Sequence, residues 1–342
     1  MDILFLEDCC EILDSMRVPI TASDRKEGKY PYYGANGIQG HVSDYIFDDE
    51  LVLLAEDGGN YGSKDKPIAY RVSGKCWVNN HAHVLKPKEG VDVDYLCYSL
   101  MFYKVEGMIN GATRQKLTQA AMKRMRIPFR DINEQQQIVA ELNCIIGIKE
   151  QRLRELKLLD DLIKARFVEM FGNCDNVVPM NDLCSIITDG THQPPMFQAK
   201  GIPFIFVSNL SDNTITYCTE KYIDEDTYKE LYKRTPIEVG DLLLSAVGSY
   251  GHPAVVVEDT KFLFQRHIAY LKPKKDIVNS FYLHSALLAP GGQRQIEEKV
   301  KGIAQKTLNL SEIRKIRIPV PDIEEQNVFA DFVRHVDKSK SA

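Results

Sequence analysis

The 342-residue sequence contains no long apolar run. A helix that spans a bilayer needs roughly 20 consecutive apolar residues, and no stretch approaches that length. This excludes a membrane protein built from such helices. The start of the chain carries Glu7 and Asp8 and lacks both a basic region and a small-residue cleavage site. We therefore expect no secretion signal, and the sequence predicts a cytoplasmic location.

Cysteine spacings typical of metal or redox sites are also missing. The eight cysteines never form the C-x-x-C pattern of a structural zinc site or a thioredoxin-like motif. We interpret them as small core residues. Cys10 in particular recurs as Cys184 in the repeat described below, which indicates a packing position.

The sequence has no excess of positive charge. A formal net charge of −5 argues against a protein that holds DNA through bulk electrostatics. Any contact with phosphates must come from local basic groups. Two such groups, residues 123–126 (Lys-Arg-Met-Arg) and 314–317 (Arg-Lys-Ile-Arg), lie at matching places in the two halves of the chain.

What the chain does contain is an internal duplication. Residues 125–135 align without a gap with residues 316–326, and the same alignment places Leu117 over Leu308. Shorter matches with small gaps pair His81 with His267. Self-similarity at this spacing indicates two similar units in tandem.

A segment of helical character separates the two units. From Leu142 to Met170, positions spaced alternately by four and three residues are apolar at seven of nine places, as in a coiled-coil seam. Gly172-Asn173 closes the segment with residues typical of a helix C-terminus. The pattern predicts one long helix of roughly 55–60 Å, a length suited to a spacer.

Each unit reads as a mixture of strands and helices. Short apolar runs at residues 51–54, 241–244 and 254–257 alternate with Gly-, Asn- and Asp-rich turns. Helical segments are expected at residues 95–102 and 281–288. The predicted class is α+β, with a twisted β-sheet in each unit. The predicted division is a first unit at 1–132, a long helix at 133–172, a second unit at 173–323 and a short second helix at 324–342.

The order of these features resembles the specificity subunits of type I restriction-modification systems over essentially the whole chain. Each unit ends in the pattern I-P-x-x-D-I-x-E-Q, at residues 127–135 and 318–326, and a helix follows each pattern. Residues 29–38 (Lys-Tyr-Pro-Tyr-Tyr-Gly-Ala-Asn-Gly-Ile) also look like the Y-P-x-Y-G-x-x-G-I run of such recognition domains.

The resemblance implies a DNA-binding function without catalysis. In this family each unit is a target-recognition domain that binds one half of a split, asymmetric site on double-stranded DNA. The two helices pack antiparallel and set the gap. They also dock two methyltransferase subunits, which bind S-adenosylmethionine and methylate adenine, and restriction or translocase subunits join them. This chain itself is expected to bind no cofactor.

Candidate DNA contacts come from polar, Gly-rich turns that follow the predicted strands. Asn and Gln pair with adenine and Arg pairs with guanine, although Gly and Asn in such places also serve simply to make turns. Arg114, Lys116 and Lys306 are predicted to contact phosphates. The candidates include Asn36, Gly59, Asn60, Tyr61, the turn Asn79-Asn80-His81, Thr113, Arg114, Gln115, Lys116, Thr191, Asn209, Ser249, Tyr250, Arg266, Gln305 and Lys306.

Other classes of function fit less well. His81 and His267 lack carboxylate or cysteine neighbours at metal spacing, so no metal site is predicted. Residues 193–196 (Gln-Pro-Pro-Met) look like the catalytic tetrapeptide of a DNA methyltransferase, but Gln and Met replace its acidic and aromatic ends and no cofactor fingerprint accompanies it. No acidic-x-Lys strand marks a nuclease. A specificity subunit of a modification-only complex remains an alternative.

The second helix departs from the family pattern, because it is much shorter than the first. In an antiparallel pair, its beginning is expected near Phe167 and Met170. An apolar stripe earlier in the first helix then lacks a partner within the chain. We expect a methyltransferase subunit or a second copy of this chain to cover it. The predicted docking residues are Leu142, Ile146, Leu153 and Leu156.

Overall fold

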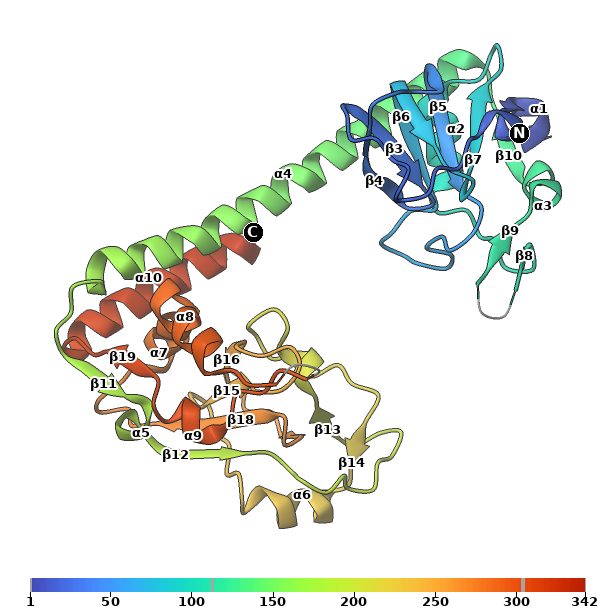
Figure 1. Cartoon of the computed structure of the whole chain (residues 1–342). Coiled ribbons are helices and arrows are strands. Elements are labelled where there is room, and N and C mark those ends of the chain that lie inside the picture. The colour runs from blue at the N-terminus through green and yellow to red at the C-terminus, as the bar shows by residue number, and fades with distance from the viewer. Residues whose placement is uncertain (1, 112–113, 303–304, 342) are drawn as a thin grey trace. The chain divides into compact units, whose positions relative to one another are not determined.

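The computed structural model describes residues 2–111, 114–302 and 305–341. The chain divides into two compact units, Met1–Gln151 and Arg152–Ala342, and the boundary falls inside one long helix, α4 (Ile132–Phe171). Figure 1 shows both units, each with its own sheet. Both units combine sheets with helices, so the predicted α+β class is confirmed.

The first unit is built on a six-stranded sheet in the order β2-β7-β5-β6-β3-β4. Neighbouring strands are antiparallel except β3 and β6, which run parallel. The strands are β2 (Cys10–Ile12), β3 (Tyr30–Gly34), β4 (Gly37–Val42), β5 (Phe47–Ala55), β6 (Ala69–Val78) and β7 (Ala82–Pro87). Smaller elements are α1 (Leu6–Cys9), η1 (Asp14–Met16), α2 (Val93–Met101), β8 (Ile109–Asn110), β9 (Lys116–Leu117) and α3 (Gln119–Lys123).

The central strand β5 explains the continuous apolar run at residues 51–54. Successive side chains of a strand point to opposite faces of the sheet. Leu51 and Leu53 belong to one core cluster, while Val52 and Leu54 belong to another. Because both faces of β5 are covered, every position in the run is buried.

The second unit repeats this design with a four-stranded antiparallel sheet in the order β12-β18-β15-β16. Its strands are β12 (Cys184–Asp189), β15 (Leu242–Ser245), β16 (Pro253–Val255) and β18 (Ile268–Pro273). A smaller sheet joins β13 (Ile202–Ile205), β14 (Tyr222–Ile223) and β17 (Leu263–Phe264). The helical elements are α5 (Met180–Leu183), η2 (Val207–Leu210), α6 (Glu225–Tyr232), α7 (Ser280–Leu288), α8 (Pro290–Lys299) and α9 (Leu310–Ile313).

The duplication inferred from the sequence is therefore a duplication of fold. The order β2-β7-β5-β6 in the first unit corresponds to β12-β18-β15-β16 in the second. In each unit the opening strand pairs antiparallel with the Ile-Pro strand of the signature: β1 (Asp2–Phe5) with β10 (Arg126–Phe129), and β11 (Val177–Pro179) with β19 (Arg317–Pro319). Cys10 and Cys184 are both buried, as expected of packing positions. Cys144 and Cys218 are exposed, so the interpretation of all eight cysteines as core residues is wrong for these two.

The last residue of each signature is a buried glutamine that fastens three segments together. In the first unit, Gln135 Oε1 accepts the N–H of Asp92, the N-cap of α2, at 2.8 Å. Its Nε2 donates to the carbonyls of Gly90 and Arg130, each at 2.9 Å. The side chain thus joins the start of α2, the preceding turn and the signature itself.

Gln326 makes the same contacts in the second unit. Its Oε1 accepts the N–H of Asn279, the N-cap of α7, at 2.9 Å, and its Nε2 donates to the carbonyls of Ile277 and Pro321 at 3.1 and 2.9 Å. Both glutamines are almost fully buried, with exposed fractions of 1% and 0%. The repeated signature therefore holds the helix that follows it against the sheet domain of the same unit.

The two helices after the signatures are α4 and α10 (Ile323–Ser341). Within the second unit α10 packs antiparallel against the C-terminal part of α4. The rings of Phe329 and Phe167 lie 5.5 Å apart at one end, and Lys340 pairs with Asp160 at 2.7 Å toward the other. The predicted contact between the start of the second helix and Phe167 is confirmed.

Several apolar side chains of α4 remain in contact with solvent. Ile146 is 37% and Leu153 is 57% exposed, while Leu142 and Leu156 are half-buried.

The described residues include no helix with both the length and the apolar character that a membrane span requires.

The contribution of Gln135 to stability can be tested against a control substitution on the same helix. Gln135→Ala removes three hydrogen bonds and leaves buried backbone groups without partners, so we expect the free energy of unfolding to fall by about 2–4 kcal/mol. Gln137→Ala is the control, because Gln137 is exposed and donates to Glu141. Its expected change is within about 0.5 kcal/mol. Equal losses in urea unfolding of the full chain would contradict the role given to Gln135.

Candidate nucleic-acid interface

In the first unit, three segments distant in sequence meet at one end of the central sheet. Glu56, which follows β5, makes a backbone hydrogen bond to each of the other two segments. Its N–H donates to the His81 carbonyl at 2.9 Å, and its carbonyl accepts the N–H of Leu117 at 2.7 Å. Gly58 N–H donates to the Gln115 carbonyl at 3.2 Å. This backbone frame positions side chains from all three segments at the same edge.

The second unit contains the same frame. Ala246 N–H donates to the His267 carbonyl at 2.9 Å, Leu308 N–H donates to the Ala246 carbonyl at 2.7 Å, and Gly248 N–H donates to the Lys306 carbonyl at 2.9 Å. The sequence alignments of His81 with His267 and of Leu117 with Leu308 are thus confirmed in space. Glu56 corresponds to Ala246 and Gln115 corresponds to Lys306.

The side chains on the two frames differ in charge. In the first unit, Asp57 Oδ1 lies 2.9 Å from His81 Nδ1 and 2.5 Å from Arg114 Nη2. Lys116 Nζ lies 2.9 Å from Glu56 Oε1. The predicted phosphate contacts Arg114 and Lys116 are therefore held by carboxylates in the free protein. Both cations remain largely exposed, so they can still meet an incoming anion.

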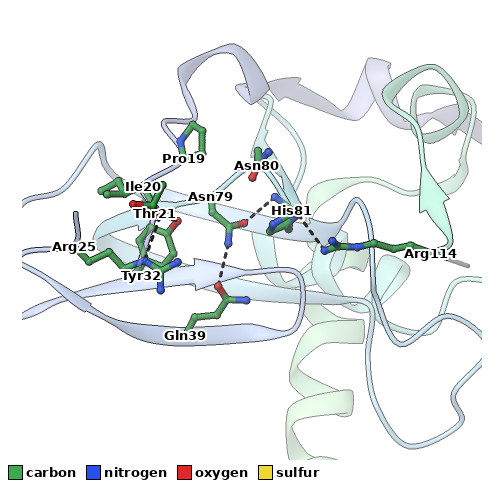
Figure 2. Close-up of a pocket in the computed structure, with 10 residues that line it drawn as sticks. All are labelled: Pro19, Ile20, Thr21, Arg25, Tyr32, Gln39, Asn79, Asn80, His81 and Arg114. Carbon is green, nitrogen blue, oxygen red and sulfur yellow. Dashed lines mark hydrogen bonds between the residues drawn. The ribbon is translucent and has the colours of Figure 1, made fainter. Parts of the chain in front are cut away.

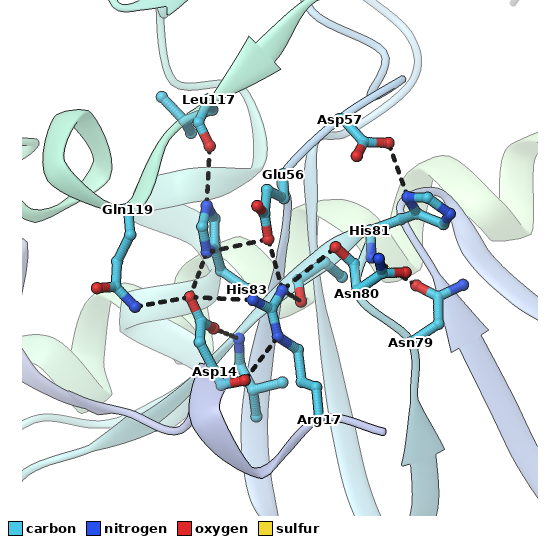
Figure 3. A network of polar contacts seen from close by, with 12 residues as sticks. Asp14, Arg17, Glu56, Asp57, Asn79, Asn80, His81, His83, Leu117 and Gln119 are labelled. Atoms are coloured by element: carbon cyan, nitrogen blue, oxygen red, sulfur yellow. Dashed lines mark hydrogen bonds and ion pairs between the residues drawn. The ribbon is translucent and has the colours of Figure 1, made fainter. Parts of the chain in front are cut away.

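A buried polar network lies beneath these ion pairs (Figure 3). His83 Nδ1 lies 2.6 Å from Asp14 Oδ2, and its Nε2 lies 2.9 Å from the Leu117 carbonyl. Arg17 pairs with Glu56 at 2.6 Å and donates to the Ala82 carbonyl at 2.7 Å. The network ties η1 and the first residues of β7 to the segment around Leu117.

The network also holds its carboxylates in the charged form. Burial by itself raises the pKa of Asp14, but the hydrogen bond and the charge of His83 outweigh it and hold the pKa below its usual value. Burial likewise opposes ionisation of Glu56, whereas its contacts with Lys116 and Arg17 lower the pKa. Both shifts favour the ionised carboxylate beside Arg17 and Lys116.

Asp14, Glu56 and His83 offer ligand atoms within 4.8 Å of one another. Sequence reasoning missed this arrangement, because the three residues are far apart in the chain and only His83 stands near the His repeat. Arg17 contacts both carboxylates, at 3.6 Å from Asp14 and 2.6 Å from Glu56. The Arg17 guanidinium already pairs with both carboxylates, so the arrangement suits an ion-pair network better than a metal ion.

A cavity of about 450 Å³ opens beside this edge of the first unit (Figure 2). The predicted residues Asn80 and Arg114 line it, together with His81. Sequence reasoning did not select two of its other residues, Tyr32 and Arg25, whose guanidinium lies 4.1 Å from the centre of the Tyr32 ring. The full lining is Pro19, Ile20, Thr21, Arg25, Tyr32, Gln39, Asn79, Asn80, His81 and Arg114.

In the second unit the predicted residues gather in two places. Lys306 Nζ lies 5.7 Å from the centre of the Tyr250 ring, with Ser249 exposed in the adjoining turn and Gln305 exposed beside Lys306. Arg266 N–H donates to the Thr191 carbonyl at 3.0 Å, and the Arg266 side chain is exposed. Burial, followed by the positive charge of Arg266, lowers the pKa of His267.

Some predicted residues use their polar atoms within the protein. Asn209 Oδ1 accepts the Phe206 N–H at 2.9 Å, and its Nδ2 donates to the carbonyls of Thr216 and Cys218. Tyr61 donates its hydroxyl to the Ala55 carbonyl at 2.8 Å, and burial raises its pKa to about 12. Both side chains fix loops with all the donors of these bonds in use, so only their remaining acceptor capacity is available to a base.

Other predicted residues of the first unit also support its loops. Asn36 Nδ2 donates to the Gly58 carbonyl at 2.9 Å, and Asn60 Nδ2 donates to the Pro67 carbonyl at 3.4 Å. A Cβ at Gly59 would lie 2.5 Å from the Ala55 Cβ, so glycine is needed for close packing there. Gln115 is exposed. Thr113 lies outside the described residues.

Comparison with known proteins identifies the family. The model of the type I restriction modification DNA specificity domain matches twice, over residues 1–158 and 176–342. The chain belongs to this specificity family. The two matches coincide with the two repeats, so the duplicated unit is the family's domain.

Similar proteins agree with this family. Over 336 residues the chain is 27% identical to the type I restriction enzyme specificity subunit S.HindORF215P of Haemophilus influenzae, covering 94% of this chain and 84% of that protein. It is 30% identical over 149 residues to the EcoBI specificity subunit of Escherichia coli, covering 44% of this chain and 31% of that protein. The S subunit of M. genitalium shares the fold, with a TM-score of 0.54, 13% identity and coverage of 99% and 90%.

As a member of the specificity family, the chain is a recognition component and not an enzyme. The methyltransferase-like tetrapeptide at residues 193–196 is a surface turn in which Met196 is 87% exposed. A catalytic aromatic platform that stacks on a flipped base would instead line a pocket.

Lys306 offers the clearest test of the phosphate contacts. Lys306→Ala should reduce the slope of log affinity against log salt by roughly 0.9, because one fewer counterion is released when DNA binds. The control is Lys229→Ala on α6, since Lys229 is also exposed but makes none of the frame's contacts. Fluorescence anisotropy of a labelled duplex from 50 to 200 mM salt, a range in which such contacts weaken strongly, measures both slopes. An unchanged slope for Lys306→Ala would place this residue outside the interface.

Proposed function

We propose that the chain reads a split, asymmetric site on double-stranded DNA, with one half read by each unit. The observation that carries this proposal is the pair of equivalent backbone frames with different side chains. Glu56 and Asp57 follow β5 in the first unit, whereas Ala246 and Val247 follow β15 in the second. Two units that share a backbone shape but present different side chains are suited to bind two different half-sites.

The charge distribution supports binding through local contacts. The net charge is −5, so nonspecific attraction to DNA is weak at long range. Arg114, Lys116 and Lys306 are exposed at the frames, where phosphates can replace the carboxylates that now hold the first two. Exchange of one anion for another keeps the cations ordered before and after binding, which lowers the entropy cost of recognition.

The partners in this proposal carry the chemistry. Two methyltransferase subunits, which bind S-adenosylmethionine, methylate adenines in the site that this chain selects, and restriction or translocase subunits join the same complex. We assign docking to the apolar stripe of α4 formed by Leu142, Ile146, Leu153 and Leu156, of which Ile146 and Leu153 are exposed and the other two half-buried. An exposed apolar stripe on a helix is a typical protein interface.

Exchange of one unit tests the two-reader proposal. Replacement of residues 1–132 by the corresponding part of the Haemophilus influenzae relative should change one half of the methylated motif and leave the other half and the gap unchanged. Sequencing that detects methylated adenines in host DNA, with and without each gene, reads out both halves. A change in both halves would mean that the units do not read DNA independently.

A double substitution tests the docking stripe. Leu142→Glu with Ile146→Glu places two charges on the stripe, so assembly with the methyltransferase should be lost while both units stay folded. Ile148→Glu is the control, because Ile148 is 63% exposed and lies on roughly the opposite side of the helix. Light scattering and circular dichroism measure assembly and folding. Unchanged assembly in the double variant would exclude the stripe as the docking surface.

A further inference from the structure

Asn79 has a buried side chain at the edge of the cavity in the first unit. It lies in the turn between β6 and β7 and is only 3% exposed. Its backbone N–H donates to the Tyr33 carbonyl at 3.0 Å, which fixes the turn against β3. Its side-chain Oδ1 accepts the N–H of His81 at 2.8 Å, and its Nδ2 donates to Gln39 Oε1 at 3.1 Å (Figure 2).

These two bonds define the direction of both amides. A backbone N–H can only donate, so the Asn79 atom that faces His81 must be the carbonyl oxygen. The other end of the Asn79 amide is then an NH₂ group, which can only donate. The Gln39 atom that faces it must therefore be Oε1. The backbone of the turn thus sets the orientation of an exposed side chain on β4.

Gly34 provides the space for Gln39. A Cβ added at Gly34 would overlap Nε2 and Cδ of Gln39, so the amide lies directly on the backbone of β3. The hydroxyl of Tyr70 donates to the Gly34 carbonyl and holds that backbone in place. The absence of a side chain at this one position allows the amide to lie flat at the mouth of the cavity.

The ordered amide still has unused hydrogen-bonding capacity. Gln39 is exposed, and its Oε1 keeps a second lone pair beside the bond from Asn79. No hydrogen bond from the rest of the described chain engages its Nε2. Gln39 thus presents an acceptor and a donor side by side, in a fixed order, in the cavity that Asn80 and Arg114 also line.

We propose that Gln39 reads an adenine in the half-site of the first unit and that Asn79 is its positioning residue. This inference rests on the proposed function. In the major groove adenine offers a donor at N6 and an acceptor at N7, which match Oε1 and Nε2 of one glutamine. Guanine offers two acceptors there, so its O6 would face Oε1 without a hydrogen atom between them.

The order imposed by Asn79 strengthens this choice. A freely rotating glutamine can turn its donor toward another base, whereas the held amide cannot do so without breaking its bond to Asn79. Loss of a bidentate contact of this type reduces discrimination at one base pair by roughly 5- to 100-fold. The effect should be confined to one position of one half-site.

Three variants of the full chain test the proposal by selection of bound sequences from a randomised DNA duplex. Gln39→Glu replaces the donor by an acceptor and should change the preference at one position from adenine to cytosine, whose N4 donates. A new preference cannot arise from misfolding. Asn79→Asp keeps the acceptor for His81 N–H but removes the donor to Gln39, so the same position should become relaxed. Gln137→Ala on α4 is the control and should select the wild-type motif.

The outcomes separate this inference from the function on which it rests. If the wild-type chain selects a motif and Gln39→Glu and Asn79→Asp both alter it at the same single position, the result supports the role of Gln39 and the proposed function. If the wild-type chain selects a motif and neither variant alters it, the role of Gln39 is wrong and the two-reader function is unaffected. A wild-type chain that enriches no motif contradicts the proposed function itself. Thermal melting of each variant checks that it is folded during the selection.

Discussion

A buried glutamine at the end of each signature is the contact on which the architecture depends. Gln135 and Gln326 each accept one backbone N–H at the start of a helix and donate to two carbonyls, so each joins the sheet domain to the helix that follows. No other residue type combines an acceptor and two donors at this reach. The pattern I-P-x-x-D-I-x-E-Q is thus a structural joint, repeated because both units need it.

Each unit also contains the same backbone frame, and the side chains on the two frames differ. The hydrogen bonds that shape the frame use only backbone groups, so residues such as Glu56 and Ala246 can differ without changing it. Asp57 holds Arg114 in the first unit, whereas Val247 occupies the equivalent place in the second and leaves His267 without a carboxylate at that position. Shape and chemistry are therefore separable, which is what two independent readers require.

Features carried by local patterns could be predicted from the sequence, and features that depend on distant contacts could not. The heptad spacing predicted a helix at 133–172, and α4 occupies Ile132–Phe171. The roles of individual polar residues were harder to predict, because Asn209 bonds to its own loop and Arg114 meets Asp57 only after folding. Gln39 was missed altogether, since its partner Asn79 lies forty residues away and no local pattern marks the pair.

In the proposed function, one chain carries two different readers. The sequences that the full chain selects from a randomised duplex test it most directly. Two different readers on one chain should select two blocks of defined bases that differ from each other and flank a stretch of constant length without base preference. A single continuous block, or two blocks that are inverted copies of each other, would contradict it.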